Sequence, residues 1–255
     1  MLTTGKERLG YPTQKPARLL RRIIEASSNE GDIILDAYCG CGTTIAVAEQ
    51  LNRQWIGIDI TYQSISSVIK RLNDSQKLSS DAITLHGVPK DIASAKALAT
   101  KKDERLRKEF EKWAVLTFTN NAGRANDGYG ADKGIDGRFY FTDIDDKGNQ
   151  IHRRSAIQVK SGHVSRKDVA EFEANLTHDK SVLGYFITLE APTKPMSDFV
   201  QSLKPFRYKM LDKNIPKISI VTIQDIMKGK RIDLPHLIAL HRKASYKDPS
   251  VQGTL

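Results

Sequence analysis

Short apolar strands alternate with helical segments in the first part of the chain, and this alternation restricts the folds open to it. Residues 32–36 and 55–59 have the apolar composition of strands, whereas residues 19–26 and 44–51 have the spacing of helices. Strands joined through helices pair in the same direction, because each helix carries the chain back along the sheet. The sequence therefore predicts an α/β fold with a parallel sheet in this region.

A second pattern begins near Lys101. The stretch KKDERLRKEFEKWAVLTF is charged at first and then amphipathic, as expected for a surface helix. A glycine-rich segment then leads into a strand, and DIDDKGNQ has the composition of a turn between two hairpin strands. Strands are predicted at residues 155–160, 182–188 and 218–223. One helix is predicted to begin at Ser165, with Asp168 three residues on, and another is predicted near residues 196–203. This region is again α/β, with an antiparallel beginning.

The two patterns predict domains at residues 1–99 and 100–235, and leave residues 236–255 as a C-terminal tail. No stretch of the sequence is apolar over the length that a membrane span requires, so we do not expect a membrane protein. Cys39 and Cys41 are the two cysteines, and one intervening residue is too short a spacing for an ordinary disulfide. Free thiols of this kind fit a reducing cytoplasm.

The chain is basic, with a formal net charge of +10 at pH 7 and a sequence pI near 9.5. Lys and Arg side chains placed against phosphates release counterions, and this supplies most of the non-specific affinity of proteins for DNA. The composition therefore favours a polyanionic partner, in the first place double-stranded DNA.

A glycine loop follows the first predicted strand, in IILDAYCGCGTTIAVAEQL. The strand ends at Asp36, and a loop with Gly40 and Gly42 leads into a helix, whose free N–H groups attract negative charge. Asp59 ends the second strand, 23 residues after Asp36, close to the spacing at which an acid meets ribose hydroxyls. The pattern indicates a nucleoside-bearing cofactor, although an ordinary strand-to-helix turn has the same composition.

The segments GYPTQKP (residues 10–16), LDAYCGCGTT and WIGID together resemble the N4-cytosine or N6-adenine DNA methyltransferases in which the cofactor motifs follow the catalytic motif. The resemblance implies part of a Rossmann-like fold that binds S-adenosylmethionine. On this basis Asp36, Gly40 and Gly42 would line the methionine part, Asp59 would hold the ribose, and Thr13 and Lys15 would close the pocket. A dinucleotide site fits less well, because the third glycine of its fingerprint is missing.

The tetrapeptide that holds the target amine in such enzymes, of DPPY or NPPY type, is absent. The chain has nine prolines, none of them adjacent, and only nine residues precede Gly10, where the tetrapeptide would lie. We therefore expect a fragment, a subunit of a split enzyme or a decayed gene product, which binds the cofactor weakly or needs a partner chain that supplies the missing half.

A second set of polar residues lies in GIDGRFYF and SAIQVKSGH. Strand alternation places Gln158 and Lys160 on one face, opposite the core-facing Ile157 and Val159. Asp136 begins the neighbouring strand, so it is expected to approach Gln158 and Lys160. Oxygen ligands for Mg²⁺ beside a lysine are what hydrolysis of a phosphodiester requires.

The GxDG and QVK motifs resemble the Mrr-like branch of the PD-(D/E)XK endonucleases. The resemblance implies that Asp136 is the principal metal ligand, Gln158 a ligand through its amide oxygen and Lys160 the residue that orients water. Gln158 stands where the more general pattern has a carboxylate, which removes one negative charge. Glu111 in the preceding helix would be an additional acid, although Glu109 is close by in the sequence.

Basic residues flank these motifs and suit contacts to the DNA backbone: Arg153, Arg154, Arg166 and Lys167. A solvated charged surface is the alternative. We thus predict a Mg²⁺-dependent restriction endonuclease of type II or type IV character joined to part of a methyltransferase, with a homodimer as the form suited to a double-strand cut. Two alternatives stay open, namely a subunit of a split methyltransferase completed in trans and a non-catalytic DNA-binding remnant.

Overall fold

The computed structural model describes residues 14–76, 78, 82–126, 134–234 and 237–238. They belong to two compact units that divide between Thr84 and Leu85, and each unit is described by itself. Within the described part of the chain, no helix is both long and apolar enough to cross a membrane. Most of the predicted tail at residues 236–255 lies outside the described residues.

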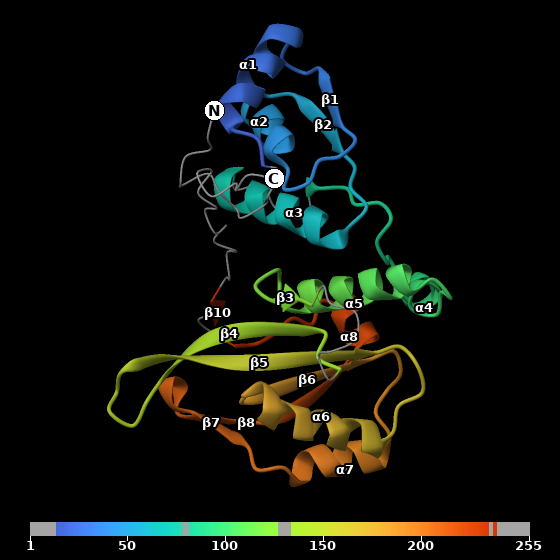
Figure 1. Ribbon diagram of the computed structural model, residues 1–255, viewed down its shortest axis with the longest axis vertical. Helices are drawn as coiled ribbons and strands as arrows, with labels where there is room; N and C mark the ends of the chain where they lie inside the picture. Colours follow the sequence, from blue (N-terminus) through green and yellow to red (C-terminus); the bar gives the residue numbers. More distant parts are fainter. Residues whose placement is uncertain (1–13, 77, 79–81, 127–133, 235–236, 239–255) are drawn as a thin grey trace, which may run out of the picture. The chain divides into compact units, whose positions relative to one another are not determined.

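The first unit contains a parallel pair of strands and three helices (Figure 1). In β1 and β2, Leu35 lies opposite Ile56 and Asp36 opposite Gly57, so the predicted parallel α/β pattern is confirmed. The elements are α1 (Ala17–Ser27), β1 (Ile33–Asp36), α2 (Thr43–Gln50), β2 (Gln54–Gly57) and α3 (Tyr62–Gln76).

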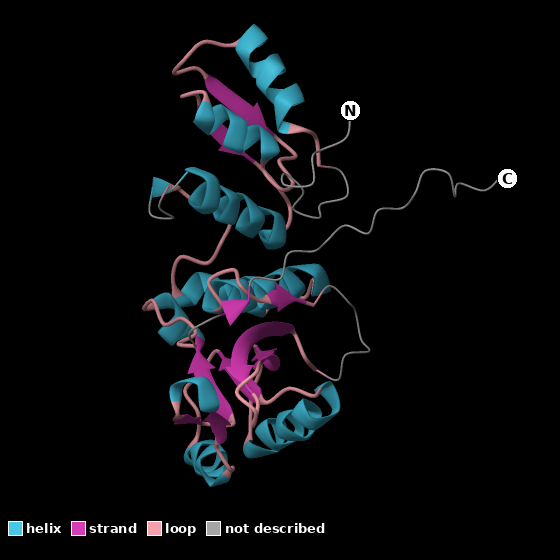
Figure 2. Ribbon diagram, turned by 90° about the vertical axis from the view of Figure 1, so that its left-hand side faces the viewer, coloured by secondary structure: helices cyan, strands magenta, loops and turns pink. Residues whose placement is uncertain are grey.

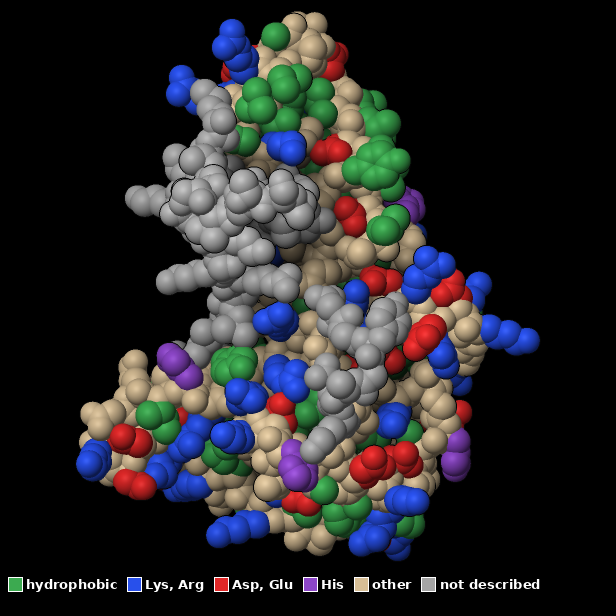
Figure 3. Space-filling model, viewed as in Figure 1, with side chains coloured by type: hydrophobic (Ala, Val, Ile, Leu, Met, Phe, Trp, Pro, Cys, Tyr) green, Lys and Arg blue, Asp and Glu red, His purple; other side chains and the backbone are tan. Residues whose placement is uncertain are grey.

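The two faces of this small sheet differ in their surroundings. On one face, Ile34 and Trp55 are half-buried and pack against Ile24 of α1 and Val47 of α2. On the other face, large apolar side chains are exposed: Ile33 (61%), Leu35 (61%), Ile56 (52%) and, just after β2, Ile58 (51%). Hydrophobic side chains gather over this part of the unit in Figure 3.

The second unit is built on a larger, mixed sheet with the strand order β10-β4-β5-β6-β9. Strands β4 and β5 are antiparallel, whereas β5, β6 and β9 run parallel, as the sequence predicts. The strands are β3 (Arg124–Ala125), β4 (Gly137–Ile144), β5 (Gln150–Lys160), β6 (Leu183–Thr188), β9 (Ile218–Thr222) and β10 (Leu237–Ile238), with a separate hairpin of β7 (Phe206–Tyr208) and β8 (Lys213–Ile215).

Helices cover both faces of this sheet. Figures 1 and 2 show α5 on one side and α6 with α7 on the other. On the α6 side, Phe172 and Phe186 are fully buried with their ring centroids 5.6 Å apart. The helices are α4 (Ile92–Ala99), α5 (Glu104–Phe118), α6 (Arg166–Asp179), α7 (Lys194–Ser202) and α8 (Ile223–Met227), with a short 3₁₀ turn, η2 (Lys209–Leu211).

Two expectations from the sequence change in the structure. Helix α4, which the sequence pattern places in the first domain, packs against α5 and α8, so the compact units divide at Thr84 instead of Ala99. Gln158 is not on a solvent-facing side of its strand, because the sheet is covered on both faces and Gln158 is as buried as its neighbours Ile157 and Val159. The predicted helix start at Ser165 is confirmed, since Ser165 and Asp168 form a capping box.

Candidate functional site

Asp136 lies just before β4, beside the carboxyl-terminal end of β5. Its backbone N–H donates to the carbonyl of Ile157 over 2.8 Å, and its Oδ2 accepts a 2.8 Å hydrogen bond from the N–H of Val159. The backbone of β5 therefore fixes both the main chain and one carboxylate oxygen of Asp136. The side chain is 14% exposed, so this carboxyl group is held in a largely water-free position.

The pKa of Asp136 is raised from 3.8 to about 6. Burial is the largest cause, and the neighbouring charge of Glu111 adds to it, whereas the Val159 N–H and the Lys108 ammonium act in the opposite direction. Two carboxylates that approach each other away from water repel, and a bound cation relieves this repulsion. Burial and the neighbouring carboxylate thus both disfavour the ionised form of Asp136, which a bound cation would favour.

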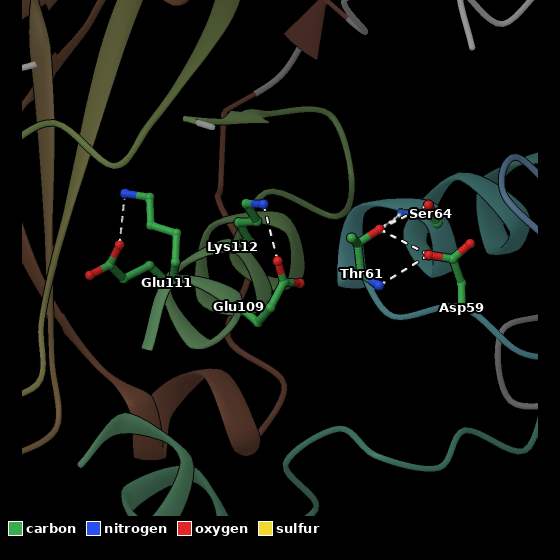
Figure 4. A network of polar contacts seen from close by, with 7 residues as sticks. Asp59, Thr61, Ser64, Glu109, Glu111 and Lys112 are labelled. Carbon is green, nitrogen blue, oxygen red and sulfur yellow. Dashed lines mark hydrogen bonds and ion pairs between the residues drawn. The ribbon is translucent and has the colours of Figure 1, made fainter. Parts of the chain in front are cut away.

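Helix α5 supplies the second carboxylate. Lys108 Nζ lies 2.9 Å from Glu111 Oε2 and 3.5 Å from Asp136 Oδ1, and so joins the two acids. Burial alone would lower the pKa of Lys108, but the hydrogen bond and charge of Glu111, together with Asp136, raise it. Glu109, the acid that lies close to Glu111 in the sequence, pairs with Lys112 at 3.0 Å. Figure 4 shows Glu111 and Glu109 pointing to different sides of the helix.

Gln158 is buried beside the turn that precedes Asp136. Its Nε2 lies against Gly134, where an added Cβ would come within 2.4 Å of it. Its Oε1 is buried and accepts no hydrogen bond from any residue that the structure describes. A buried amide oxygen without a donor is costly, and a metal ion or a metal-bound water would satisfy it.

Lys160 is the last residue of β5 and is half-buried. Burial would raise the pKa of Asp168, but the hydrogen bonds from Ser165 and the charge of Lys160 lower it, which places Lys160 near the start of α6. Among the described residues, no hydrogen bond or ion pair joins Lys160 to Asp136. The structure therefore brings Lys108 into contact with both Glu111 and Asp136, and places Gln158 and Lys160 at the same end of β5.

This donor set fits Mg²⁺ better than a softer metal. Mg²⁺ is commonly held by one or two carboxylates and several waters, and an amide oxygen is an acceptable further ligand. In the described part of the chain, no three His, Cys, Asp or Glu side chains gather as a metal site. Asp136, Glu111 and Gln158 are the residues that would hold the ion.

The four basic residues predicted to contact DNA have different environments. Arg153 faces the fully buried Asp143 at 3.6 Å, and Arg154 donates to the carbonyl of Asp179 over 2.6 Å. Arg166, at the start of α6, lies over the ring of Phe199 at 4.8 Å, and Lys167 beside it is exposed. Arg166 and Lys167 are therefore more accessible to a DNA backbone than Arg153 and Arg154, whose charges already have internal partners.

In the first unit, the predicted cofactor residues converge at the carboxyl ends of β1 and β2. Asp59 Oδ2 accepts a 3.0 Å hydrogen bond from the Gly40 N–H, and Asp36 Oδ1 accepts one of 3.1 Å from the Tyr38 N–H. Burial, followed by the charges of Asp59 and Asp36, raises the pKa of the Cys39 thiol to about 11. This edge of the sheet therefore carries two carboxylates and a glycine loop around a thiol that stays protonated.

The loop geometry depends on residues outside the predicted set. Asp59 Oδ1 also accepts from the Thr61 N–H at 3.0 Å, and the Thr61 hydroxyl donates to Ser64 at 2.8 Å (Figure 4). Gly42, at φ +70°, caps α2 where a Cβ would come within 2.7 Å of Val68. Lys15 is exposed just before α1, and Thr13 lies outside the described residues.

Similarity to known proteins divides along the same two units. Residues 2–70 match the family model of a DNA methylase, and residues 104–224 match that of a restriction endonuclease of the Mrr catalytic type. The chain joins a DNA methylase segment to a restriction endonuclease domain. The predicted cofactor residues lie within the range matched by the methylase, and the predicted metal-site residues lie within the range matched by the endonuclease.

Individual relatives and solved structures are similar to parts of this chain. The type II methyltransferase M.HpaI of Haemophilus parainfluenzae is 50% identical over 125 residues, which is 48% of this chain and 37% of that protein. The crystal structure of an M1.HpyAVI–SAM complex is 39% identical over 26% of this chain and 33% of its own, with a TM-score of 0.26. The modification-dependent restriction endonuclease AspBHI is 18% identical over 59% of this chain and 37% of its own, with a TM-score of 0.36. The chain covers only 14% to 37% of the length of four curated relatives that it matches.

Lys108 is the residue of the endonuclease domain that sequence reasoning missed. It lies in a run of alternating charges, KKDERLRKEFEK, in which each side chain has the pattern of a solvated surface. The spacing of three residues between Lys108 and Glu111 was an available signal, because it places both on one face of a helix. Thr61 of the methylase segment was missed in the same way, and its signal was the position two residues after Asp59 at the start of a helix.

Proposed function

We propose that the endonuclease domain hydrolyses phosphodiester bonds of double-stranded DNA with Mg²⁺, using Asp136, Glu111 and Gln158 as ligands. The observation that carries this proposal is that Lys108 bridges the carboxylates of Glu111 and Asp136, at the end of β5 where the buried amide oxygen of Gln158 has no donor among the described residues. When bound there, Mg²⁺ would polarise the phosphate and acidify a water molecule. The family match of residues 104–224 supports the same reaction class.

The protein's own residues would perform the remaining tasks. Lys160, at the end of β5, would orient the attacking water or stabilise the charge that develops on the phosphate. Arg166 and Lys167 would contact phosphates and position the duplex without reading its sequence. Because a double-strand cut needs one such site for each strand, we expect a homodimer as the cleaving form, acting in the cytoplasm.

A plasmid nicking assay of the full chain with Mg²⁺ or Mn²⁺ tests this proposal, on methylated and unmethylated DNA. We expect cleavage by the wild type, and its loss in Asp136→Ala and Lys160→Ala. Glu111→Gln should lower the rate at least tenfold, whereas its matched control Glu109→Gln, on another side of α5, should cleave normally. Absence of cleavage by the wild type on every substrate, with DNA binding retained, would favour a non-catalytic DNA-binding remnant.

A second function is favoured by the methylase segment. We propose that Asp36, Gly40, Gly42 and Asp59 bind S-adenosylmethionine, and that a chain carrying a DPPY-type tetrapeptide completes an amino-methyltransferase of restriction-modification type. The supporting observation is the exposed apolar face of β1 and β2, described above. Parallel sheets normally have helices on both faces, so this face is suited to a complementary half of the same fold.

Calorimetric titration with S-adenosylmethionine separates the possibilities for this segment. We expect weak binding by the chain alone and tighter binding after co-expression with a methyltransferase half that contains the tetrapeptide. Asp59→Asn should weaken binding of S-adenosylmethionine both by the chain alone and after co-expression with the partner half. Asp32→Asn, before β1, is the matched control. Binding of equal strength with and without the partner half would contradict completion in trans.

A further inference from the structure

The two carboxylates of the candidate metal site share one ammonium group. Lys108 Nζ lies 2.9 Å from Glu111 Oε2 and 3.5 Å from Asp136 Oδ1. The other oxygen of Asp136, Oδ2, is already engaged by the N–H of Val159. Oδ1 is therefore the oxygen of Asp136 that a metal ion would use, and Lys108 is the cation that faces it.

The three side chains are shielded from solvent, with exposed fractions of 16% for Lys108, 28% for Glu111 and 14% for Asp136. In such surroundings charges attract and repel more strongly than in water. An ammonium and a divalent cation at the same pair of carboxylates would repel each other. Both cations therefore cannot occupy the position between Glu111 and Asp136 favourably.

The position of Lys108 on its helix would allow its ammonium group to move away from the two carboxylates. Residues 101–107 are exposed, and Glu104 lies four residues before Lys108, on the same side of the first turns of α5. A lysine side chain is flexible, and rotation about its own bonds would carry the ammonium from the carboxylate pair towards Glu104 and solvent. This movement requires no change in the fold.

We propose that Lys108 is a placeholder cation, which holds Glu111 and Asp136 together in the metal-free domain and competes with the divalent metal for them. The inference rests on the proposed metal site and adds to it a residue that sets metal affinity. It explains how two repelling carboxylates are kept in place before metal and DNA arrive. It also makes the domain bind metal more weakly than its carboxylates alone would allow.

The test is calorimetric titration of the full chain with Mn²⁺ in the absence of DNA. Lys108→Met removes the ammonium and keeps most of the apolar stem, and we expect Mn²⁺ to bind at least about tenfold more tightly than to the wild type. Lys112→Met is the matched control on the same helix, because Lys112 pairs with Glu109, and its affinity should equal that of the wild type. Asp136→Ala should abolish binding.

The outcomes separate this inference from the proposed function. Wild-type binding that Lys108→Met leaves equal or weaker overturns the placeholder role and leaves the metal site standing. Absence of binding by both proteins overturns the metal site itself, and with it the inference.

A second measurement covers the case in which Lys108→Met does not fold. In wild-type protein labelled at lysine, the NMR signal of the Lys108 ammonium should shift and lose its protection from exchange as Mg²⁺ is added. The Lys112 signal serves as the internal reference. A Lys108 signal that does not change while Mg²⁺ binds contradicts displacement.

Discussion

The two units of this chain share an α/β composition and differ in whether helices cover one face of the sheet or both. In the endonuclease domain, α5 covers one face of the sheet and α6 with α7 cover the other, so that Phe172 and Ile157 are completely buried on opposite sides. In the methylase segment, two strands are covered on one face only, and Leu35 is 61% exposed on the other. The candidate metal site thus lies in the unit whose sheet is covered on both faces, and the unit with the exposed sheet face is the one that matches a DNA methylase over residues 2–70.

The largest expected loss of stability comes from a substitution in the buried core of the endonuclease domain. Phe172→Ala should destabilise the endonuclease domain by about 3–5 kcal/mol, because it removes a fully buried ring that packs on Phe186. Urea unfolding followed by hydrogen exchange and mass spectrometry, which reports each unit separately, measures this loss. We expect faster exchange throughout residues 134–234 and little change in residues 14–76. Equal loss of protection in both units would show that they unfold as one body.

The second prediction concerns the glycine loop of the methylase segment. Gly42→Ala should cost about 2–4 kcal/mol, because alanine is strained at φ +70° and its Cβ would come within 2.7 Å of Val68. Gly31→Ala is the matched control, since Gly31 has φ +82° and nothing within 4 Å of an added Cβ, and it should cost only about 1 kcal/mol. Equal costs, measured by urea unfolding, would remove the close approach of α3 as the reason for glycine at position 42.

The third prediction uses the electrostatics of the nuclease site. Because the pKa of Asp136 is raised to about 6 in the folded chain, its ionisation opposes folding increasingly as the pH rises from about 4 to about 6, and fully above that. Asp136→Asn removes this cost and leaves Lys108 paired with Glu111. At pH 8 the variant should be about 3 kcal/mol more stable than the wild type, and near pH 4 the difference should vanish. A difference that is independent of pH would contradict the assigned shift.

Much of the fold and of the candidate site could be predicted from the sequence, and the exceptions have physical reasons. Strand alternation and turn composition located β1, β2, β5, β6 and β9, and the Ser165 capping box located α6, because these signals are local. Helix α3 was not predicted, although Ile65, Val68 and Leu72 recur at helical spacing. Burial of Gln158 could not be predicted, because it depends on helices packing on both faces of the sheet.

The smallest expected effect concerns the open face itself. Leu35→Ser should change the stability of the chain by less than about 0.5 kcal/mol, because the side chain is already exposed to water. Its neighbour Ile34 faces α1 and α2, so Ile34→Ser should cost about 2 kcal/mol and is the matched control. Urea unfolding at several protein concentrations measures both variants. If Leu35→Ser costs as much as Ile34→Ser, and the cost grows with concentration, the face is covered by a second copy in solution. A small, concentration-independent effect leaves the face free for a complementary methyltransferase half, and Leu35→Ser should then weaken that association.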